Sequence, residues 1–393
     1  MARAAGPWGN ASLLLFPMAL AILAALLASF GVCWLLIASR RAHGRLTNDE
    51  TTPGLQKVHR TPVPRIGGFG ILAGVAAGAV FIGNREDVSW MALFLLASLP
   101  AFVGGFLEDL TRKVSPHSRL LFAFGAAAVG YVLLDGRITD LDLPGDDYLF
   151  QYEIFAFGFT LFAVGGFAHA TNIVDGMNGL SGLVGVAILA AIAAVANHVG
   201  DARVLHAALV VGTATLGFLL WNYPRGAIFA GDGGAYFLGF AIAELAVLLV
   251  QRNSEVSPWF ALLALWYPTW ETLFSMYRRK VVQGRSTAAP DGLHLHTLVY
   301  RRVVKGHGRR SPAARSALTT LVMLGLCLLT AVPAWLFWDE TWVLQLYAAA
   351  FALIYLWIYR RIVRFGLPWG GLLLRTRGKG AAARRARHSG GTL

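Results

Sequence analysis

The chain has 393 residues, of which 56% are hydrophobic and only 14% are charged. A soluble domain carries about 25% charged residues, so this composition excludes an ordinary soluble protein. The net charge of +13 would suggest a nucleic-acid binder in a soluble chain, but here it fits the basic loops of a membrane protein, and we expect no nucleic-acid partner. Cys33 and Cys327 lie inside apolar runs without metal-ligand spacing, which indicates neither a disulfide framework nor a zinc site.

Apolar runs long enough to cross a membrane as helices, about 17 to 25 residues, recur along the chain. They predict an all-α polytopic membrane protein with eleven spans, near 11–38, 65–83, 90–107, 119–134, 153–170, 179–197, 205–221, 233–250, 258–277, 316–338 and 341–359. The first run is too long for a signal peptide and no small-residue cleavage site follows it, so we expect a retained helix. We expect one integral-membrane domain, 1–359, followed by a basic C-terminal tail, 360–393.

Basic residues are distributed unevenly over the loops. Of the 34 Lys and Arg residues, 29 fall in alternate loops and the C-terminal tail, and five fall on the other side. The positive-inside rule therefore places the N-terminus outside and the C-terminus in the cytoplasm. The predicted cytoplasmic side holds seven acidic residues, mostly near glycines or polar residues at helix ends: Asp49, Glu50, Glu108, Asp109, Asp175, Asp232 and Asp291. Carboxylates gathered on one face among basic residues indicate a site for a metal and an anionic substrate.

The first two polar stretches on this side are LQKVHRTPVPRIGGFG, which contains Lys57, and GFLEDLTRKVSPHSRLL. In the second stretch, Glu108 and Asp109 stand together at the end of an apolar run. Adjacent acids at a membrane interface can simply cap or solvate a helix end. In a working site, one acid orients a metal or a substrate while the other accepts a proton or helps an anion to attack. Arg119 follows closely and could hold a phosphate.

The next two stretches also end or begin spans. In HATNIVDGMNGL, the residues Asn172, Asp175 and Asn178 are three apart, so helical winding would place them on one face. Their oxygen atoms suit a hard cation such as magnesium, although Asn and Asp are also ordinary turn and N-cap residues. In FAGDGGAYFLGF, glycines around Asp232 would let the backbone approach a ligand, and the following helix start favours an anion. The alternative for this stretch is a tight turn that re-enters the membrane.

The last stretch is YRRKVVQGRSTAAPDGLHLHTLVYRR. Its His294 and His296, with Arg285 nearby, could hold a diphosphate or a sugar. His-x-His alone is a weak metal signal, and a basic loop is often a patch for anionic lipid. The basic tail that ends in KGAAARRARHSGGTL is also expected to be drawn to anionic membrane lipid.

Taken together and in this order, the stretches resemble the polyprenyl-phosphate N-acetylhexosamine-1-phosphate transferases over about residues 47–300. KVHRTPVPRIGG is similar to the first cytoplasmic motif of the family and LEDLTRKVSPHSRLL to its aspartate-pair motif. NIVDGMNGL, FAGDGGAYFLG and PDGLHLH resemble the Asn-x-x-Asp-Gly motif, the Gly-Asp motif and the histidine-rich loop. The resemblance implies a multi-spanning enzyme of the bacterial inner membrane. Such an enzyme moves N-acetylhexosamine-1-phosphate from a UDP-sugar to polyprenyl (undecaprenyl) phosphate and releases UMP, as the first membrane step of a surface polysaccharide or envelope glycan.

The resemblance also implies roles for the matching residues. Magnesium, or manganese, would be bound mainly by Asp232 with Asn172 as a second ligand, and Asp109 would activate the lipid phosphate. Glu108 and Lys57 would take part in catalysis. Six further residues would bind the nucleotide sugar: Asp175, Asn178, Arg119, His294, His296 and Arg285.

Two departures from the family pattern leave alternatives open. Glu108 stands where the family usually has Asp, and Thr297 stands where a third histidine is common. Because of Thr297, we rank a phospho-N-acetylmuramoyl-pentapeptide transferase below a UDP-N-acetylhexosamine enzyme. A transporter of lipid-linked sugars, from another class, would need ionisable residues in the middle of its spans, where only Glu244 and Glu271 qualify. The exact sugar and a possible homodimer stay open.

Overall fold

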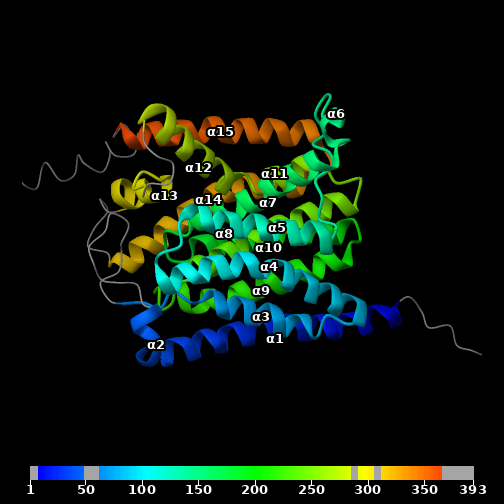
Figure 1. Ribbon diagram of the computed structural model, residues 1–393, viewed down its shortest axis with the longest axis horizontal. Coiled ribbons are helices and arrows are strands. Elements are labelled where there is room, and N and C mark those ends of the chain that lie inside the picture. Colours follow the sequence, from blue (N-terminus) through cyan, green and yellow to red (C-terminus); the bar gives the residue numbers. More distant parts are fainter. Residues whose placement is uncertain (1–7, 48–61, 285–290, 305–310, 365–393) are drawn as a thin grey trace, which may run out of the picture.

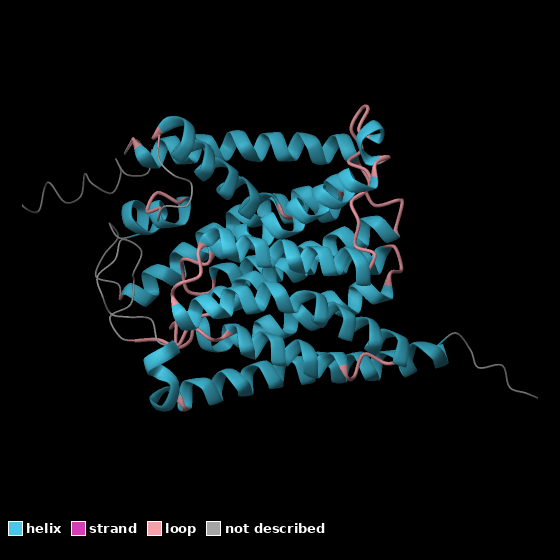
Figure 2. Cartoon of the chain, in the orientation of Figure 1, coloured by secondary structure: helices cyan, strands magenta, loops and turns pink. Residues whose placement is uncertain are grey.

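The protein is a bundle of helices, as the computed structural model shows for residues 8–47, 62–284, 291–304 and 311–364 (Figure 1). Within these ranges the chain forms no strand, in agreement with the predicted all-α class (Figure 2). The helices of the first half are α1 (Trp8–Ala38), α2 (Arg40–Thr47), α3 (Gly68–Ala79), α4 (Arg85–Thr111), α5 (Pro116–Leu133), α6 (Asp147–Phe150), α7 (Glu153–Val174) and α8 (Leu180–His198). The second half contains α9 (Ala202–Asn222), α10 (Gly231–Arg252), α11 (Pro258–Ala264), α12 (Trp266–Tyr277), the π-helical turn η1 (Arg278–Val282), α13 (Leu295–Leu298), the π-helical turn η2 (Val299–Val304), α14 (Pro312–Leu336) and α15 (Thr341–Val363).

The predicted number of eleven spans is not confirmed. Among the described residues, eight helices are long and apolar enough to cross a membrane: α1, α4, α7, α8, α9, α10, α14 and α15. The predicted span 65–83 contains α3, which has only 12 residues and is therefore about 18 Å long at 1.5 Å per residue. The predicted span 119–134 corresponds to α5, which has 18 residues. The chain is thus a multi-pass membrane protein with fewer qualifying helices than hydrophobic runs.

The predicted span 258–277 is interrupted in its middle. Helix α11 ends at Ala264, and α12 begins at Trp266 after a non-helical Leu265. Pro268 explains the interruption, because it has no N–H to donate to the carbonyl of Ala264 four residues earlier. In Figure 1, α12 runs obliquely to the bundle, toward the end where α13 lies.

The two ends of the bundle separate the loops as the charge pattern predicts. Helices α2 and α13, which belong to segments predicted to be cytoplasmic, lie at one end, and α6, from a predicted external loop, lies at the other (Figure 1). Helix α1 begins at the end that holds α6, whereas α15 finishes at the opposite end. Which of these ends faces the cytoplasm stays a prediction from the basic residues.

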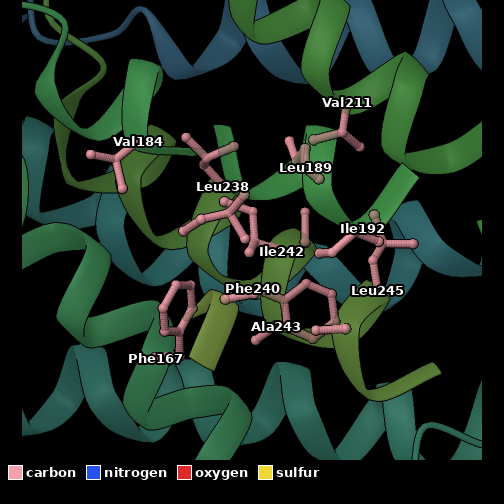
Figure 3. Packing of buried hydrophobic residues seen from close by; sticks show 14 of the residues in the cluster. Phe167, Val184, Leu189, Ile192, Val211, Leu238, Phe240, Ile242, Ala243 and Leu245 are labelled. Carbon is pink, nitrogen blue, oxygen red and sulfur yellow. The ribbon is translucent and has the colours of Figure 1, made fainter. Parts of the chain in front are cut away.

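Helix α10 is the core of the bundle. It packs against α3, α4, α5, α7, α8, α9 and α11, and every residue from Gly231 to Leu249 is buried. Figure 3 shows Leu238, Ile242 and Leu245 of α10 among side chains of α7, α8 and α9. A helix that is apolar all round is stable only when other helices or lipid cover it. The central position of α10 fixes where its first turn, with Asp232, meets the ends of its neighbours.

Candidate functional site

The side chain of Asp109, at the end of α4, caps the start of α10. Its Oδ1 accepts the backbone N–H of Asp232 at 2.9 Å, and its Oδ2 accepts the N–H of Gly233 at 2.9 Å. Asp109 is only 3% exposed. The first N–H groups of a helix have no partner within the helix, and a carboxylate there is stabilised by the helix dipole. Asp109 therefore fixes the position of the first turn of α10.

Two glycines make this contact possible. A Cβ added to Gly105, one turn before Asp109 on α4, would lie 2.5 Å from the carbonyl oxygen of Asp232. Gly231 has a φ of +74°, and a side chain there would also collide with Arg65 and Asp109. These two glycines let α4 and the start of α10 approach each other, whereas the sequence analysis expected the glycines around Asp232 to admit a ligand.

Two arginines bind the carboxylate of Asp232, which is 8% exposed. Arg65 Nη2 lies 3.2 Å from Asp232 Oδ1 and 3.6 Å from Asp109 Oδ1. Arg119 Nη1 donates to Asp232 Oδ2. The turn between α4 and α5 brings Arg119 into place, because Arg112 ends α4 in a left-handed conformation and Ser115 caps α5. The structure therefore joins the aspartate-pair stretch and the Gly-Asp stretch in one charged cluster.

Glu108, the other acid of the pair, points elsewhere. Its Oε2 accepts the N–H of Val114 at 2.8 Å, within the turn between α4 and α5, and the side chain is only partly buried. Adjacent residues of a helix point about 100° apart, so the two acids cannot face the same place. Glu108 therefore stabilises the turn between α4 and α5, whereas Asp109 binds the start of α10.

The stretch that follows α7 is only partly helical, which corrects one expectation. Helix α7 ends at Val174, so Asn172, Asp175 and Asn178 do not lie on one face of a continuous helix. Asp175 is the C-cap residue and accepts the hydroxyl of Ser181 at 2.5 Å. Its burial raises the pKa of this carboxyl group, whereas the Ser181 hydrogen bond and the positive charge of Arg65 lower it.

Asn178 and the unpredicted Asn222 hold this turn in the bundle. The backbone N–H of Asn178 donates to Ser316 on α14 at 2.9 Å, and its side-chain amide donates to the carbonyl of Pro224 at 3.0 Å. Asn222 accepts the N–H of Gly179 and donates to the carbonyl of Ile228. Both asparagines therefore have contacts that position the loops around the site.

The histidine stretch is buried between α12 and α15. The rings of His294 and His296 stack with centroids 5.5 Å apart and an interplanar angle of 4°. His294 Nδ1 lies 3.0 Å from Oε1 of Glu271, and His294 Nε2 lies 3.6 Å from Oδ2 of Asp291. Burial lowers the pKa of His296 to about 4. His296 is therefore neutral near pH 7, where it can donate from one ring nitrogen and accept at the other.

A cavity of about 1270 Å³ connects these groups. Seven of the predicted site residues line it: Arg119, Asn172, Asp175, Asn178, Asp232, His294 and His296. Asp109 and Glu108 do not line it, so Asp109 lies behind Asp232 as seen from the cavity. Lys57 and Arg285 lie outside the residues that the structure describes. Arg65 and the buried Arg279 also line the cavity and were not singled out in the sequence, where they are two of many basic loop residues.

The cavity changes character along its length. Beyond the charged end, side chains from α5, α7, α10 and α12 line it with apolar and aromatic groups: Phe124, Phe159, Phe162, Phe167, Val247 and Trp266. It continues to residues of the opposite end, among them Leu141 and Trp259, where the Trp259 indole N–H donates to the Leu141 carbonyl at 2.9 Å. One end can bind a charged group, and the remainder can bind a long apolar chain.

The donor atoms at the charged end fit a hard divalent cation. Asp232 and Asn172 both line the cavity and offer the oxygen ligands that magnesium prefers. Both oxygens of Asp232 face arginines here, so a cation bound to Asp232 would replace one of those contacts. Among the residues that the structure describes, one group of three acidic side chains has oxygen atoms within 4.8 Å of one another: Asp140, Asp146 and Asp147. This group lies just before and at the start of α6, and it contains neither Asp232 nor Asn172. The metal ligands stay a prediction.

Comparison with known proteins places this geometry in context. Residues 91–250 match the family described as glycosyl transferase family 4. The chain is 28% identical over 246 residues, 62% of its length and 67% of the relative, to a probable undecaprenyl-phosphate N-acetylglucosaminyl 1-phosphate transferase of Bacillus subtilis. It is 28% identical over 331 residues, 80% of its length and 85% of the relative, to an undecaprenyl-phosphate alpha-N-acetylglucosaminyl 1-phosphate transferase of Yersinia pestis. It is also 30% identical over 305 residues, 71% of its length and 83% of the relative, to a phospho-N-acetylmuramoyl-pentapeptide-transferase of a Synechococcus strain.

Proposed function

Since the chain belongs to glycosyl transferase family 4, among the polyprenyl-phosphate hexosamine-1-phosphate transferases, we propose that it transfers N-acetylhexosamine-1-phosphate from a UDP-sugar to undecaprenyl phosphate and releases UMP. The observation that carries this proposal is the cavity, whose charged end adjoins a long apolar stretch. The chemistry of the two substrates matches these two parts of the cavity. The UDP-sugar is a water-soluble diphosphate, and the lipid substrate is a phosphate on a long hydrocarbon. The product would begin a surface polysaccharide or an envelope glycan at the inner membrane.

The reaction requires two anions to meet. An oxygen of the lipid phosphate attacks the β-phosphorus of the UDP-sugar, and the bond from that phosphorus to the oxygen bridging the α-phosphorus breaks. The electron pair of that bond leaves with UMP. Arg65, Arg119 and Arg279 line the cavity and supply positive charge for the phosphate oxygens. Guanidinium groups suit this task because they stay charged and can donate two parallel hydrogen bonds to a phosphate.

A divalent cation, magnesium or manganese, is part of the proposal. Asp232 and Asn172 would hold it, and when bound it would offset the negative charge of the diphosphate. Asp109 contributes through the first turn of α10, because its two hydrogen bonds fix the backbone that carries Asp232. Direct activation of the lipid phosphate by Asp109 stays a prediction, because Asp109 does not line the cavity.

The apolar part of the cavity supports a lipid acceptor. Its aromatic lining can bind the hydrocarbon chain while the phosphate reaches the arginines at the charged end. The same arrangement is consistent with a site at the cytoplasmic face, where the nucleotide sugar arrives from water.

The competing candidate within the family transfers phospho-N-acetylmuramoyl-pentapeptide, the activity named for the Synechococcus relative. We rank it second because Thr297, buried and lining the cavity, stands where a third histidine is common. This choice concerns only the sugar donor, since undecaprenyl phosphate is the acceptor in either case.

One assay decides between the candidates. The purified protein is incubated in detergent with undecaprenyl phosphate, magnesium and one donor at a time from UDP-N-acetylglucosamine, UDP-N-acetylgalactosamine and UDP-N-acetylmuramoyl-pentapeptide. Release of UMP with an N-acetylhexosamine donor, and only when the lipid phosphate is present, is the expected result. Release only with the pentapeptide donor would establish the second candidate, and no release with any donor would refute the proposed function.

A further inference from the structure

Glu271 is a buried carboxylate inside a predicted membrane span, and one of its oxygens contacts the histidine stretch. It lies on α12 and is 1% exposed. Its Oε1 accepts the backbone N–H of Leu295 at 3.0 Å and lies 3.0 Å from His294 Nδ1. Its Oε2 accepts the hydroxyl of Tyr355 on α15 at 2.7 Å. One carboxylate therefore connects α12, α15 and the start of α13.

These contacts determine which nitrogen of His294 carries the proton. A carboxylate has no hydrogen to donate, so the 3.0 Å contact requires a hydrogen on Nδ1 of His294. The other nitrogen, Nε2, lies 3.6 Å from Asp291 Oδ2, beyond hydrogen-bond distance. That oxygen of Asp291 already accepts from Ser275 and from Arg278. Because His294 lines the cavity, Nε2 is the ring nitrogen left for a ligand.

We infer that Glu271 is a positioning residue, which holds His294 with its Nδ1–H toward α12 and leaves Nε2 for a hydrogen-bonding group of the bound nucleotide sugar. Tyr355 fixes the second oxygen of Glu271 and so makes α15 part of this support. The inference rests on the proposed function, because it assigns the ligand of His294 to the UDP-sugar. A purely structural role for Glu271, as a link between α12 and α13, predicts different results in the experiments below.

The kinetic experiment compares variants at equal amounts of folded protein. Glu271→Leu removes every acceptor from this position, and we expect kcat/KM for the UDP-sugar to fall about 10- to 100-fold, as when a residue that orients a metal-binding histidine is removed. Glu271→Gln should restore most of that loss, because its amide oxygen can accept from Leu295 and His294 and its amide N–H can donate to Tyr355. The KM for undecaprenyl phosphate should stay unchanged in both variants.

The matched control is Glu244→Leu on α10. Glu244 is fully buried like Glu271, but neither of its oxygens has a hydrogen-bond partner among the described residues. The chemical change is therefore the same without the contact to His294. We expect this control to keep the wild-type kcat/KM for the UDP-sugar. An equal loss of kcat/KM in Glu244→Leu and Glu271→Leu would overturn the inference.

A double-mutant cycle separates positioning from general support. If Glu271 acts through His294, then Glu271→Leu should change kcat/KM by less than about threefold in a His294→Ala background, although it has a large effect alone. Additive losses would show that Glu271 acts independently of His294 and would overturn the inference.

A spectroscopic measurement tests the inference without turnover. Nitrogen NMR of histidine-labelled protein reports the protonation of each ring, and the signal missing in His294→Ala identifies His294. We expect a protonated Nδ1 in the wild type and loss of that proton from Nδ1 in Glu271→Leu. A wild-type ring with a bare Nδ1 would refute the inference even if UMP release supports the proposed function. Conversely, a protonated Nδ1 in a protein that releases no UMP would refute the proposed function and the assigned ligand, but not the geometry.

Discussion

Replacing Asp109 by asparagine changes one atom and should affect both stability and transfer. The carboxylate of Asp109 accepts the N–H groups of Asp232 and Gly233 at the start of α10. An asparagine side chain has only one oxygen, and its other end is an N–H donor. One of the two backbone N–H groups would therefore face a donor and lose its partner.

The structure gives the size of the effect. Hydrogen bonds to a charged group contribute about 1.5–3 kcal/mol each, and a buried donor without a partner costs about 1–3 kcal/mol. Losing the negative charge at the N-terminus of α10 removes about 0.3–2 kcal/mol more. We therefore expect Asp109→Asn to lower the free energy of unfolding by about 2–4 kcal/mol.

Transfer should fall for a related reason. The first turn of α10 carries Asp232, and a displacement of about 1 Å at a reacting centre can cost about a hundredfold in rate. If Asp109 also accepts a proton from the lipid phosphate, its loss costs a further factor of about 10² to 10⁴. We expect UMP release by Asp109→Asn to decrease on the order of a thousandfold or more.

The assay measures UMP release at saturating magnesium and the melting temperature in detergent for the same preparations. Glu108→Gln is the matched control, because its amide oxygen can still accept the N–H of Val114. It should melt close to the wild type and keep an intermediate activity, whereas Glu108→Asp should keep most of the activity. If Asp109→Asn remained active and stable while Glu108→Gln lost both properties, the assignment within the pair would be reversed.

Three further predictions concern the metal, the orientation and the histidines. Asp232→Asn should reduce UMP release on the order of a thousandfold, and chelation of the metal should abolish release until magnesium or manganese is added; turnover by Asp232→Asn near the wild-type rate would show that the site is misplaced. A reporter fused after Leu393 should be active only in the cytoplasm, and activity only outside would reverse the predicted orientation. Burial lowers the pKa of His296 from 6.5 to about 4, so the stability that depends on its neutral form is present above pH 6.5 and is lost as the pH falls through 4. His296→Gln should therefore flatten the decrease in melting temperature over this pH range, and an unchanged slope would contradict the prediction.

The sequence predicts the helices and the end of the bundle where the charged residues gather, because both depend on local composition. Apolar runs locate the helices, and polar residues next to glycines locate their ends. Asp232 could be proposed as a site residue for this reason, since it follows a glycine and precedes a long apolar run. The interruption of the helix at Leu265 is not predicted by hydropathy, because two short apolar helices separated by one residue have the same composition as one continuous span.

The pairings across the site depend on tertiary packing, which the sequence does not display. Arg65 is one of six basic residues in its predicted loop, and only the structure shows its contact with Asp232. Glu271 and His294 are separated by 23 positions, and only the structure shows their contact. Asp109 was predicted to meet the lipid phosphate, yet its contact with the start of α10 depends on how closely two glycine-containing helices pack.

The position of Glu271 also bears on the choice between an enzyme and a transporter. Two acids inside predicted spans, Glu244 and Glu271, were the only sequence features that favoured transport. Glu271 binds the histidine stretch at the charged end, so it is not a carboxylate along a path through the bundle. Glu244 does not line the cavity. The acidic residues that do line it, among those the structure describes, are Asp140 near the end that holds α6, and Asp175, Asp232 and Asp291 near the charged end. A sugar diphosphate is an anion and needs basic partners, and among the described residues the arginines that line the cavity lie toward its two ends: Arg65, Arg119 and Arg279 at the charged end, and Arg137 near the end that holds α6. Movement between the ends would take the charge across the aromatic stretch, and burying unpaired charges in apolar surroundings is very costly. The lining of the cavity therefore favours a reaction at one end, with the hydrocarbon of the acceptor in the apolar part.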